Sequence, residues 1–229
     1  MVKYKKIAED ISKRIKENEF NNVLPTEEEL IQEYKVSRTT IRSAIDTLVL
    51  KGQLYRVQGS GVYLRKQDYE DMLSLNNYNG LTDEFPNNVV TSKVLFFEKK
   101  KANKSEAKRL HCEEKTNIYN FIRIRFIDEF PYCIEDMLIN KMVIPYLGED
   151  IIKGSLYNYI EEDLGFPLGY VDRYIVAEPL PANYASLFNV EINRPSLVVD
   201  QKMYLENGTL FGHAKITYND TVLFSSSSR

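Results

Sequence analysis

The first 65 residues carry the pattern that most restricts the fold of this chain: three short helices with one apolar face each, followed by two short strands. Apolar residues at intervals of three and four predict the helices. Short runs of β-branched and aromatic residues around a glycine-rich turn predict the strands. The pattern predicts helices over residues 4–18, 27–34 and 38–50, and strands over 53–57 and 62–65.

Local signals indicate where these elements begin and turn. Thr26, followed three residues later by Glu29, is a capping box that starts the second helix. Ser37 is the predicted N-cap of the third helix. Gly59 and Gly61 allow the positive φ angles of a tight hairpin. Three helices and then a hairpin, in this order, predict a winged helix-turn-helix.

Such a domain binds DNA with the first turns of its third helix, which fits the major groove. Arginine there donates two hydrogen bonds to guanine or pairs with phosphate, and threonine bonds phosphate through its hydroxyl. A hairpin tip with exposed backbone can approach a minor groove. Each feature alone also fits a capped surface helix or an ordinary turn. The candidate DNA contacts are Thr26, Ser37, Arg38, Thr39, Thr40, Arg42, Arg56, Gln58 and Gly59.

Charge is divided unevenly along the chain. Residues 1–66 carry 13 Lys and Arg against 9 Asp and Glu, whereas residues 67–229 carry 17 against 24. A basic head on an acidic body suits a protein that binds phosphates at one end only. The chain has two cysteines, a charged start and no apolar run of the ~18 residues that a membrane helix needs. We therefore expect a cytoplasmic protein with reduced thiols, no membrane segment, no metal and no cofactor.

The second half mixes strands and helices, which predicts an α+β domain with a mostly antiparallel sheet and helices packed against it. A weak internal repeat at an offset of 77 residues places Leu110 on Leu187 and Phe126 on Met203, so one unit is expected twice. The polar stretch 67–79 is the expected linker between domains over residues 1–66 and 80–229. The predicted strands cover residues 90–98, 118–127, 132–139, 168–178, 196–206 and 209–218, and the predicted helices cover 104–110, 155–164 and 182–188.

Arg123 and Arg125 lie two residues apart on one predicted strand, so their side chains share a face about 7 Å apart. Like charges this close repel unless an anion or a carboxylate lies between them, and the guanidinium fork suits phosphate. Glu135, on the next strand, can accept hydrogen bonds from hydroxyl groups. Ser155 begins a predicted helix, where free N–H groups favour an anion. These residues predict a site for an anionic ligand.

Plainer interpretations also apply to this half. The two arginines can instead pair with Glu135, Asp136 or Asp172 on the sheet surface. His111 and His213, the only histidines, lack a cluster of acids or cysteines around them in the sequence. A surface or helix-end histidine is therefore favoured over metal binding or catalysis, although His213 lies in a hairpin near the predicted ligand site.

Residues 4–65 resemble the head of GntR-family regulators. The resemblance rests on Leu24-Pro25-Thr26-Glu27-Glu28-Glu29-Leu30, Val36-Ser37-Arg38-Thr39-Thr40-Ile41-Arg42 and Val57-Gln58-Gly59-Ser60-Gly61. It implies a homodimer on a palindromic DNA operator, with Arg38 and Arg42 in the major groove and Gly59 at the wing tip. Glu28 departs from the family, which usually carries arginine there.

Residues 75–224 resemble the UTRA effector-binding domain of the HutC-type branch, which is related in fold to chorismate lyase. The matching segments are Gly80-Leu81-Thr82, Arg123-Ile124-Arg125, Pro131-Tyr132-Cys133-Ile134-Glu135, Gly154-Ser155-Leu156-Tyr157 and Lys215-Ile216-Thr217-Tyr218. In relatives that bind sugar phosphates, the resemblance implies that the phosphate is held by Thr82, Arg123, Arg125, Ser155 and Tyr157. It also implies that the sugar meets Glu135 and Tyr218, and Leu81 completes the set of candidate effector residues. Where relatives often carry an acidic residue near the last strand, this chain has Gly212.

The expected function is a DNA-binding transcription regulator, a repressor of a sugar uptake or catabolism operon that a phosphorylated sugar releases from its operator. Two alternatives stay open at this point. One is a lyase or hydrolase that uses the C-terminal pocket, for which Glu135 is the only acid–base candidate beside the arginines. The other is a DNA-binding module whose second half serves dimerisation alone.

Overall fold

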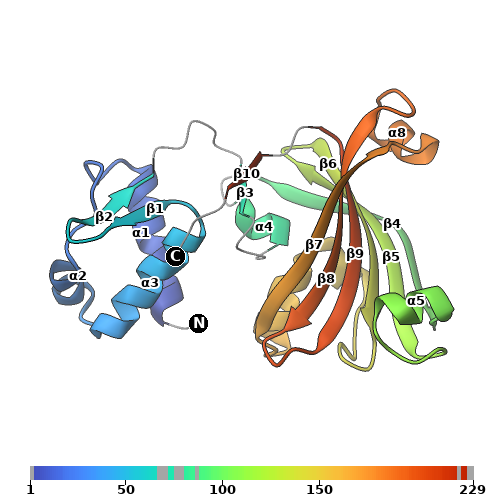
Figure 1. Cartoon of the computed structure of the whole chain (residues 1–229), viewed down its shortest axis with the longest axis horizontal. Coiled ribbons are helices and arrows are strands. Elements are labelled where there is room, and N and C mark those ends of the chain that lie inside the picture. The colour runs from blue at the N-terminus through green and yellow to red at the C-terminus, as the bar shows by residue number, and fades with distance from the viewer. Residues whose placement is uncertain (1–2, 66–71, 75–79, 86–87, 221–222, 226–229) are drawn as a thin grey trace. The chain divides into compact units, whose positions relative to one another are not determined.

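A computed structural model describes residues 3–65, 72–74, 80–85, 88–220 and 223–225 of the chain. The chain forms two compact units, Met1–Asn77 with Leu223–Arg229, and Tyr78–Val222 (Figure 1). The last strand, at residues 223–225, thus groups with the first unit, whereas the sequence pattern places it in the second domain. Within the described ranges, no helix is both long enough and apolar enough to cross a membrane.

The first unit is the predicted winged helix-turn-helix. Its elements are α1 (Lys3–Lys16), α2 (Glu27–Tyr34), α3 (Arg38–Leu50), β1 (Leu54–Val57) and β2 (Gly61–Leu64). The capping box is present, with Thr26 and Glu29 each accepting a backbone hydrogen bond from the other. Ser37 caps α3 by accepting a hydrogen bond from the Thr40 N–H at 3.3 Å. The apolar faces of the helices form one core, made of Ile7, Ala8, Ile11, Leu24, Leu30, Ile41, Ala44, Ile45, Leu48 and Leu54.

A small second sheet in this unit joins two segments that are far apart in the sequence. Strand β3 (Met72–Ser74) lies inside the stretch 67–79 that the sequence indicates as a linker, and β10 (Leu223–Ser225) lies near the end of the chain. The two strands pair in parallel, with Met72 opposite Leu223. Neither strand is predictable from periodicity, because three residues are too few to show an alternating pattern. The remaining residues of the stretch lie outside the described ranges.

The second unit is built on a six-stranded antiparallel sheet, which confirms the α+β prediction. The strand order is β4-β5-β6-β9-β8-β7. The strands are β4 (Val90–Lys101), β5 (Asn117–Ile127), β6 (Phe130–Asn140), β7 (Leu168–Pro179), β8 (Pro195–Leu205) and β9 (Leu210–Tyr218). The helical segments are α4 (Gly80–Glu84), α5 (Lys104–Arg109), α6 (Glu149–Lys153), α7 (Leu156–Asn158), the π-helical turn η1 (Tyr159–Asp163) and α8 (Ala182–Phe188). The single helix predicted over 155–164 is therefore divided into α7 and η1, and the short α4 and α6 were not predicted.

The sheet contains one structural unit twice, as the sequence repeat predicts. The first copy is β4-α5-β5-β6 and the second is β7-α8-β8-β9, and the copies meet where β6 pairs with β9. Met137 and Ala214, which the offset of 77 residues relates, lie directly opposite each other in this pairing. A pseudo-twofold axis therefore passes through the centre of the sheet near this pair.

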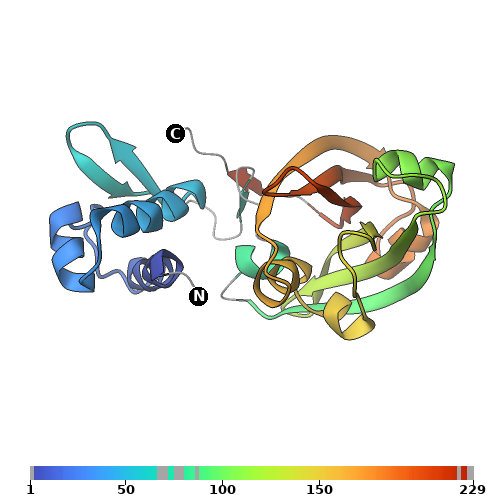
Figure 2. The same cartoon turned by 90° about the horizontal axis from the view of Figure 1, so that it is seen from below.

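Both faces of the sheet are covered by helices, so both sets of side chains on its central strands are buried. On the inner face, residues from α6, α7 and η1 pack with Tyr119 and Phe121. On the outer face, α5 packs against Ile118 and α8 packs against Ile124. Figure 2 shows the sheet curving around its inner face, with α5 on the outside. The strand at 117–127 is thus apolar toward both faces, and Arg123 and Arg125 belong to the inner one.

Candidate DNA-binding and effector-binding sites

The third helix of the first unit presents an exposed polar face. Ser37 and Thr40, in the first turn, have hydroxyl oxygens 2.9 Å apart. Arg38, Thr39 and Arg42 are exposed on the side of α3 that the core does not use. The burial of the opposite side fixes the rotation of the helix and so keeps this polar face toward solvent, where a groove of DNA can receive it.

Both exposed arginines of α3 are held by acidic residues of α2. Arg38 donates a hydrogen bond from Nη2 to Oε1 of Glu28 at 3.0 Å. Arg42 donates from Nε to both carboxylate oxygens of Glu27, at 3.0 and 2.9 Å. Glu28, the residue at which the chain departs from the GntR pattern, therefore contacts one of the predicted DNA-binding arginines.

The wing carries the third arginine and an open tip. Arg56 donates from Nη1 to Oδ1 of Asp46 on α3, at 2.6 Å. Gly59 has a φ of 74°, and a Cβ placed on it would meet nothing within 4 Å. Gln58 is exposed beside it. Thr26, by contrast, engages its hydroxyl in the α2 cap, so a DNA contact through this atom competes with the cap.

In the second unit, Arg123 forms a buried ion pair. Its Nε donates to Oε2 of Glu135 at 2.6 Å, from β5 to the adjacent β6. Its Nη1 donates to the backbone carbonyls of Ile152 and Gly154, the second at 2.9 Å. Burial alone raises the pKa of Glu135, but the charges of Arg123 and Arg125 outweigh this effect and hold that pKa below its usual value. The pair is therefore ionised and satisfied within the protein.

Arg125 is buried with an unused donor. Its Nη2 donates to Oγ1 of Thr82 on α4 at 3.1 Å, and its Nη1 lies 4.0 Å from Oε2 of Glu135. Its Nε has no hydrogen-bond partner among the residues that the structure describes. Burial lowers the pKa of Arg125, the charge of Glu135 opposes this shift, and the charge of Arg123 adds to it. A buried guanidinium in this state is stabilised by an additional anion.

The sequence also allows the arginines to pair with acidic residues of the sheet, and one of the three candidate acids does so. The pairing with Glu135 is present, but it lies inside the unit instead of on the surface. Asp136 follows Glu135 on β6 and so faces outward, where its basic neighbours are Arg109, His213, Lys215 and Lys100. Asp172, on β7, is exposed and lies opposite Lys202. One carboxylate thus serves two guanidinium groups, which leaves this cluster with a net positive charge.

Two residues that the sequence does not single out lie beside Tyr157 and Tyr218, which are predicted effector residues. Gln201 on β8 donates from Nε2 to the Tyr157 hydroxyl at 3.3 Å and accepts from Nε of Arg173 on β7 at 3.2 Å. Burial raises the pKa of Tyr157 to about 12 and that of Tyr218 well above its usual value, so both hydroxyls stay protonated and can donate. Arg173 and Gln201 occupy ordinary strand positions, and only the pairing of β7 with β8 brings them here.

A glycine brings α4 to this cluster. Gly80 has a φ of 67°, and a Cβ on it would lie 2.6 Å from Cδ2 of Tyr157. Any larger residue would therefore collide with the tyrosine ring. The close approach places Leu81, which is buried, and Thr82 next to Tyr157 at the start of α4. The predicted effector residues of α4, β5, β6 and α7 are thus brought together.

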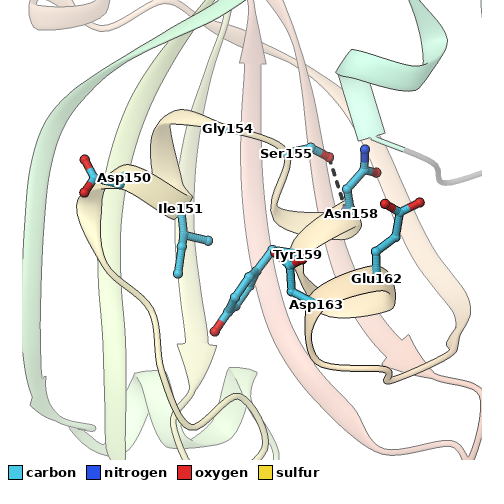
Figure 3. Close-up of a pocket in the computed structure, with 8 residues that line it drawn as sticks. All are labelled: Asp150, Ile151, Gly154, Ser155, Asn158, Tyr159, Glu162 and Asp163. Carbon is cyan, nitrogen blue, oxygen red and sulfur yellow. Dashed lines mark hydrogen bonds between the residues drawn. The ribbon is translucent and has the colours of Figure 1, made fainter.

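Ser155 borders a separate hollow of about 460 Å³ on the second unit. Its hydroxyl accepts a hydrogen bond from the Asn158 N–H at 3.3 Å, which caps the three-residue α7 (Figure 3). Asp150, Glu162 and Asp163 contribute carboxylates to the lining of this hollow. Such a lining repels phosphate, so the acidic hollow does not fit an anionic ligand. Ser155 is adjacent to the arginine cluster through Gly154, whose carbonyl accepts a hydrogen bond from Arg123.

Gly212 lies at the apolar end of the inner face. A Cβ on Gly212 would lie 2.6 Å from Cε of Met203 and 2.7 Å from Cδ1 of Ile139. These two side chains therefore fill the space that an acidic side chain at position 212 would need. This end of the inner face is closed by apolar groups.

Neither histidine borders the arginine cluster. His213 points to the outer face, where its Nε2 lies 2.9 Å from Oδ1 of Asp200. His111 lies just beyond α5, with its Nε2 3.0 Å from Nζ of Lys202. Within the described part of the chain, no group of three or more His, Cys, Asp or Glu residues is placed to hold a metal ion.

Comparison with protein families and known proteins accounts for both units. The model of the bacterial regulatory proteins of the gntR family matches residues 3–64, and the UTRA domain model matches residues 87–221. The uncharacterized HTH-type transcriptional regulator YydK of Bacillus subtilis is 31% identical over 221 residues, which are 96% of this chain and 94% of that protein. The crystal structure of YydK superposes with a TM-score of 0.82 at 29% identity and covers 100% of both chains.

Two further relatives are named as repressors. The HTH-type transcriptional repressor NagR of Bacillus subtilis is 27% identical and covers 94% of this chain and 89% of its own length. The mannosyl-D-glycerate transport/metabolism system repressor MngR of Escherichia coli is 26% identical and covers 94% of this chain and 91% of its own length. The chain belongs to the GntR family of bacterial regulatory proteins, carries a UTRA domain, and is a transcription regulator and not an enzyme.

Proposed function

We propose that this regulator is a cytoplasmic repressor that binds operator DNA as a homodimer and releases it when a phosphorylated sugar binds the inner face of the second unit. The observation that carries the proposal is the buried Arg125, whose Nε has no partner among the described residues while its Nη2 bonds Thr82. A phosphate monoester brings about −1.5 to −2 charges and several acceptor oxygens to such a site. The guanidinium fork and the threonine hydroxyl together match that group.

The remainder of the cluster suits a polyhydroxylated molecule. The hydroxyls of Tyr157 and Tyr218 can donate to sugar oxygens, and Glu135 can accept from sugar hydroxyls with its second oxygen. The name of MngR refers to a sugar derivative, mannosyl-D-glycerate, which supports a carbohydrate class of ligand. The apolar contacts of Gly212 limit the room at the far end, so the ligand that we expect is compact.

Release from DNA requires that the ligand bind one conformation of the protein more tightly than another. The bond between Arg125 and Thr82 joins β5 to α4, the helix that follows the expected linker in the sequence. A phosphate bound by Arg125 competes for the same guanidinium donors. Ligand binding thereby changes the contact that holds α4, and this is the step that we assign to effector response.

A thermal-shift panel tests the proposal. Sugar phosphates, the corresponding free sugars and inorganic phosphate are added to the full-length chain, and one sugar phosphate is expected to stabilise it by several degrees. Arg125→Gln should abolish this stabilisation, whereas Arg109→Gln, at an exposed position of α5, should preserve it. The same compound should lower affinity for operator DNA. If every compound leaves the melting temperature unchanged, or if Arg125→Gln responds like the wild type, the sugar-phosphate proposal is wrong and a second unit that only dimerises becomes the better description.

A further inference from the structure

Each arginine that we expect at the DNA carries an acidic partner from the same unit. The three contacts are Arg38–Glu28 at 3.0 Å, Arg42–Glu27 at 2.9 Å and Arg56–Asp46 at 2.6 Å. DNA phosphate must therefore compete with a carboxylate for each guanidinium. We propose that Glu27 is a specificity-determining residue, which weakens binding of Arg42 to the DNA backbone more than its binding to the bases of the operator.

These ion pairs contribute little to folding. The side chains of Arg38 and Glu28 are 54% and 75% exposed, and those of Arg42 and Glu27 are 56% and 30% exposed. Pairs this exposed contribute on the order of 0–1 kcal/mol to stability. The start of α2 is secured separately by the Thr26–Glu29 capping box. Two acidic residues that the fold does not need thus lie against the helix expected to read DNA.

The geometry of the Arg42 contact is compatible with base reading. Arg42 binds Glu27 through Nε, and its two Nη groups have no partner among the described residues. Those two groups are the donors that arginine presents to O6 and N7 of guanine. A carboxylate on Nε therefore holds the guanidinium in place and leaves its base-reading edge open.

The same carboxylates weaken the binding of the arginines to the phosphate backbone. Non-specific binding is almost entirely electrostatic, so a carboxylate next to each arginine offsets the charge that attracts phosphate. When an arginine turns to a phosphate, it leaves its carboxylate unpaired close to the DNA. Glu27 accordingly lowers the affinity for random sequence and costs less at an operator that offers guanine to Arg42. Glu28 differs, because it binds Nη2 of Arg38 and so competes with base and phosphate alike.

The test compares Glu27→Gln and Glu28→Gln with Glu33→Gln in the full-length chain. Glu33 also lies on α2 and also binds an arginine, with Oε1 2.7 Å from Nη1 of Arg14 on α1. All three variants change the net charge equally, but Glu33 does not contact α3. Affinity is measured by fluorescence anisotropy on two duplexes of about three helical turns. One has random sequence, and the other is enriched from a random library by the wild-type protein.

For Glu27→Gln and Glu28→Gln we expect affinity for the random duplex to rise roughly three- to tenfold, as for removal of one nearby charge at the surface. The slope of log K against log salt should steepen by about 0.9 for each variant. Affinity for the enriched duplex should rise less for Glu27→Gln. It should rise equally for Glu28→Gln, because Glu28 binds a base-reading donor of Arg38. Glu33→Gln should match the wild type. For Glu27→Gln, an equal rise on both duplexes, an effect no larger than that of Glu33→Gln, or a loss confined to the enriched duplex would each overturn the proposal.

This inference rests on the proposed contact of α3 with DNA, and a separate variant checks that contact. If Arg42→Ala leaves affinity for the enriched duplex unchanged, the placement of α3 at the DNA is wrong. If Arg42→Ala weakens that affinity while Glu27→Gln behaves like the wild type, α3 does contact DNA and only the role of Glu27 fails.

Discussion

The Nε atom of Arg123 lies 2.6 Å from Oε2 of Glu135, and the two side chains are only 4% and 11% exposed. The residues face each other on β5 and β6, so strand register alone brings them together. Removing two charges from water costs several kcal/mol per ion, which only close pairing and further hydrogen bonds offset. Arg123 has these bonds, to the carbonyls of Ile152 and Gly154, whereas the Nε of Arg125 has no hydrogen-bond partner among the described residues.

Breaking the buried pair from one side should destabilise the second unit strongly. Arg123→Ala leaves the buried Glu135 with only Arg125 near it, at 4.0 Å, so we expect a loss of about 3–5 kcal/mol in unfolding free energy. Urea titration followed by circular dichroism measures it. The triple variant Arg123→Met, Arg125→Met, Glu135→Leu should regain most of the loss, because it leaves no buried charge of this cluster without a partner. If Arg123→Ala is as stable as the wild type, water still solvates the Arg123–Glu135 pair and the prediction is wrong.

Removing Arg42 should impair DNA binding and leave effector binding intact. Arg42→Ala should weaken operator affinity by about 1–3 kcal/mol, the range for an arginine that binds guanine. A gel-shift titration measures this loss, and the thermal shift with the effector should stay at the wild-type value. Lys13→Ala, at an exposed position of α1, serves as the control and should bind DNA normally.

An acidic residue at position 212 should not fit without a compensating change. Gly212→Glu collides with Met203 and Ile139, and we expect it to cost about 1–3 kcal/mol through overpacking. Met203→Ala creates space on one side, so the double variant should be more stable than the sum of the single effects implies. Thermal denaturation of all four proteins gives the coupling. Strict additivity would mean that Met203 does not restrict this position.

Stability should fall as His213 becomes protonated. Burial lowers the pKa of His213, although Asp200 and Asp136 oppose the shift and Arg109 adds to it. The unfolded chain then binds the proton more readily than the folded one, so stability is greatest above about pH 6.5 and declines as the pH drops.

The measurement for His213 is the melting temperature between about pH 7.5 and 5.5. His213→Gln should flatten the decline over this interval, and His111→Gln should retain the wild-type profile. If the wild-type melting temperature rises on acidification over the same interval, protonation of His213 does not destabilise the protein and the prediction is wrong.

Local sequence signals predict the first unit well. Thr26, Ser37 and Gly59 each act within a few residues of themselves, through caps and a turn, so no tertiary information is needed to place them. The acidic partners of the arginines are not visible in this way, because the contact between Glu28 and Arg38 crosses from one helix to another.

The second unit is predictable only in part. Arg123 and Arg125 stand out because charges are unusual in an apolar strand, and Glu135 follows from pairing with the next strand. Gln201 and Arg173 give no such signal, because their relation to Tyr157 depends on the curvature of the sheet and on the helices that cover its inner face. The burial of both sheet faces likewise hides the alternation that usually separates core from surface.

The pseudo-twofold axis near Met137 and Ala214 has an evolutionary consequence. Two separate copies of a three-stranded unit, pairing along the edges now occupied by β6 and β9, would form the same sheet as this single chain. The boundary between the two copies runs through the arginine cluster, with Arg123, Arg125 and Glu135 on one side and Gln201 and Arg173 on the other. Because both copies belong to one chain, each can mutate independently of the other. A new ligand can therefore be acquired by altering one half while the other preserves the framework.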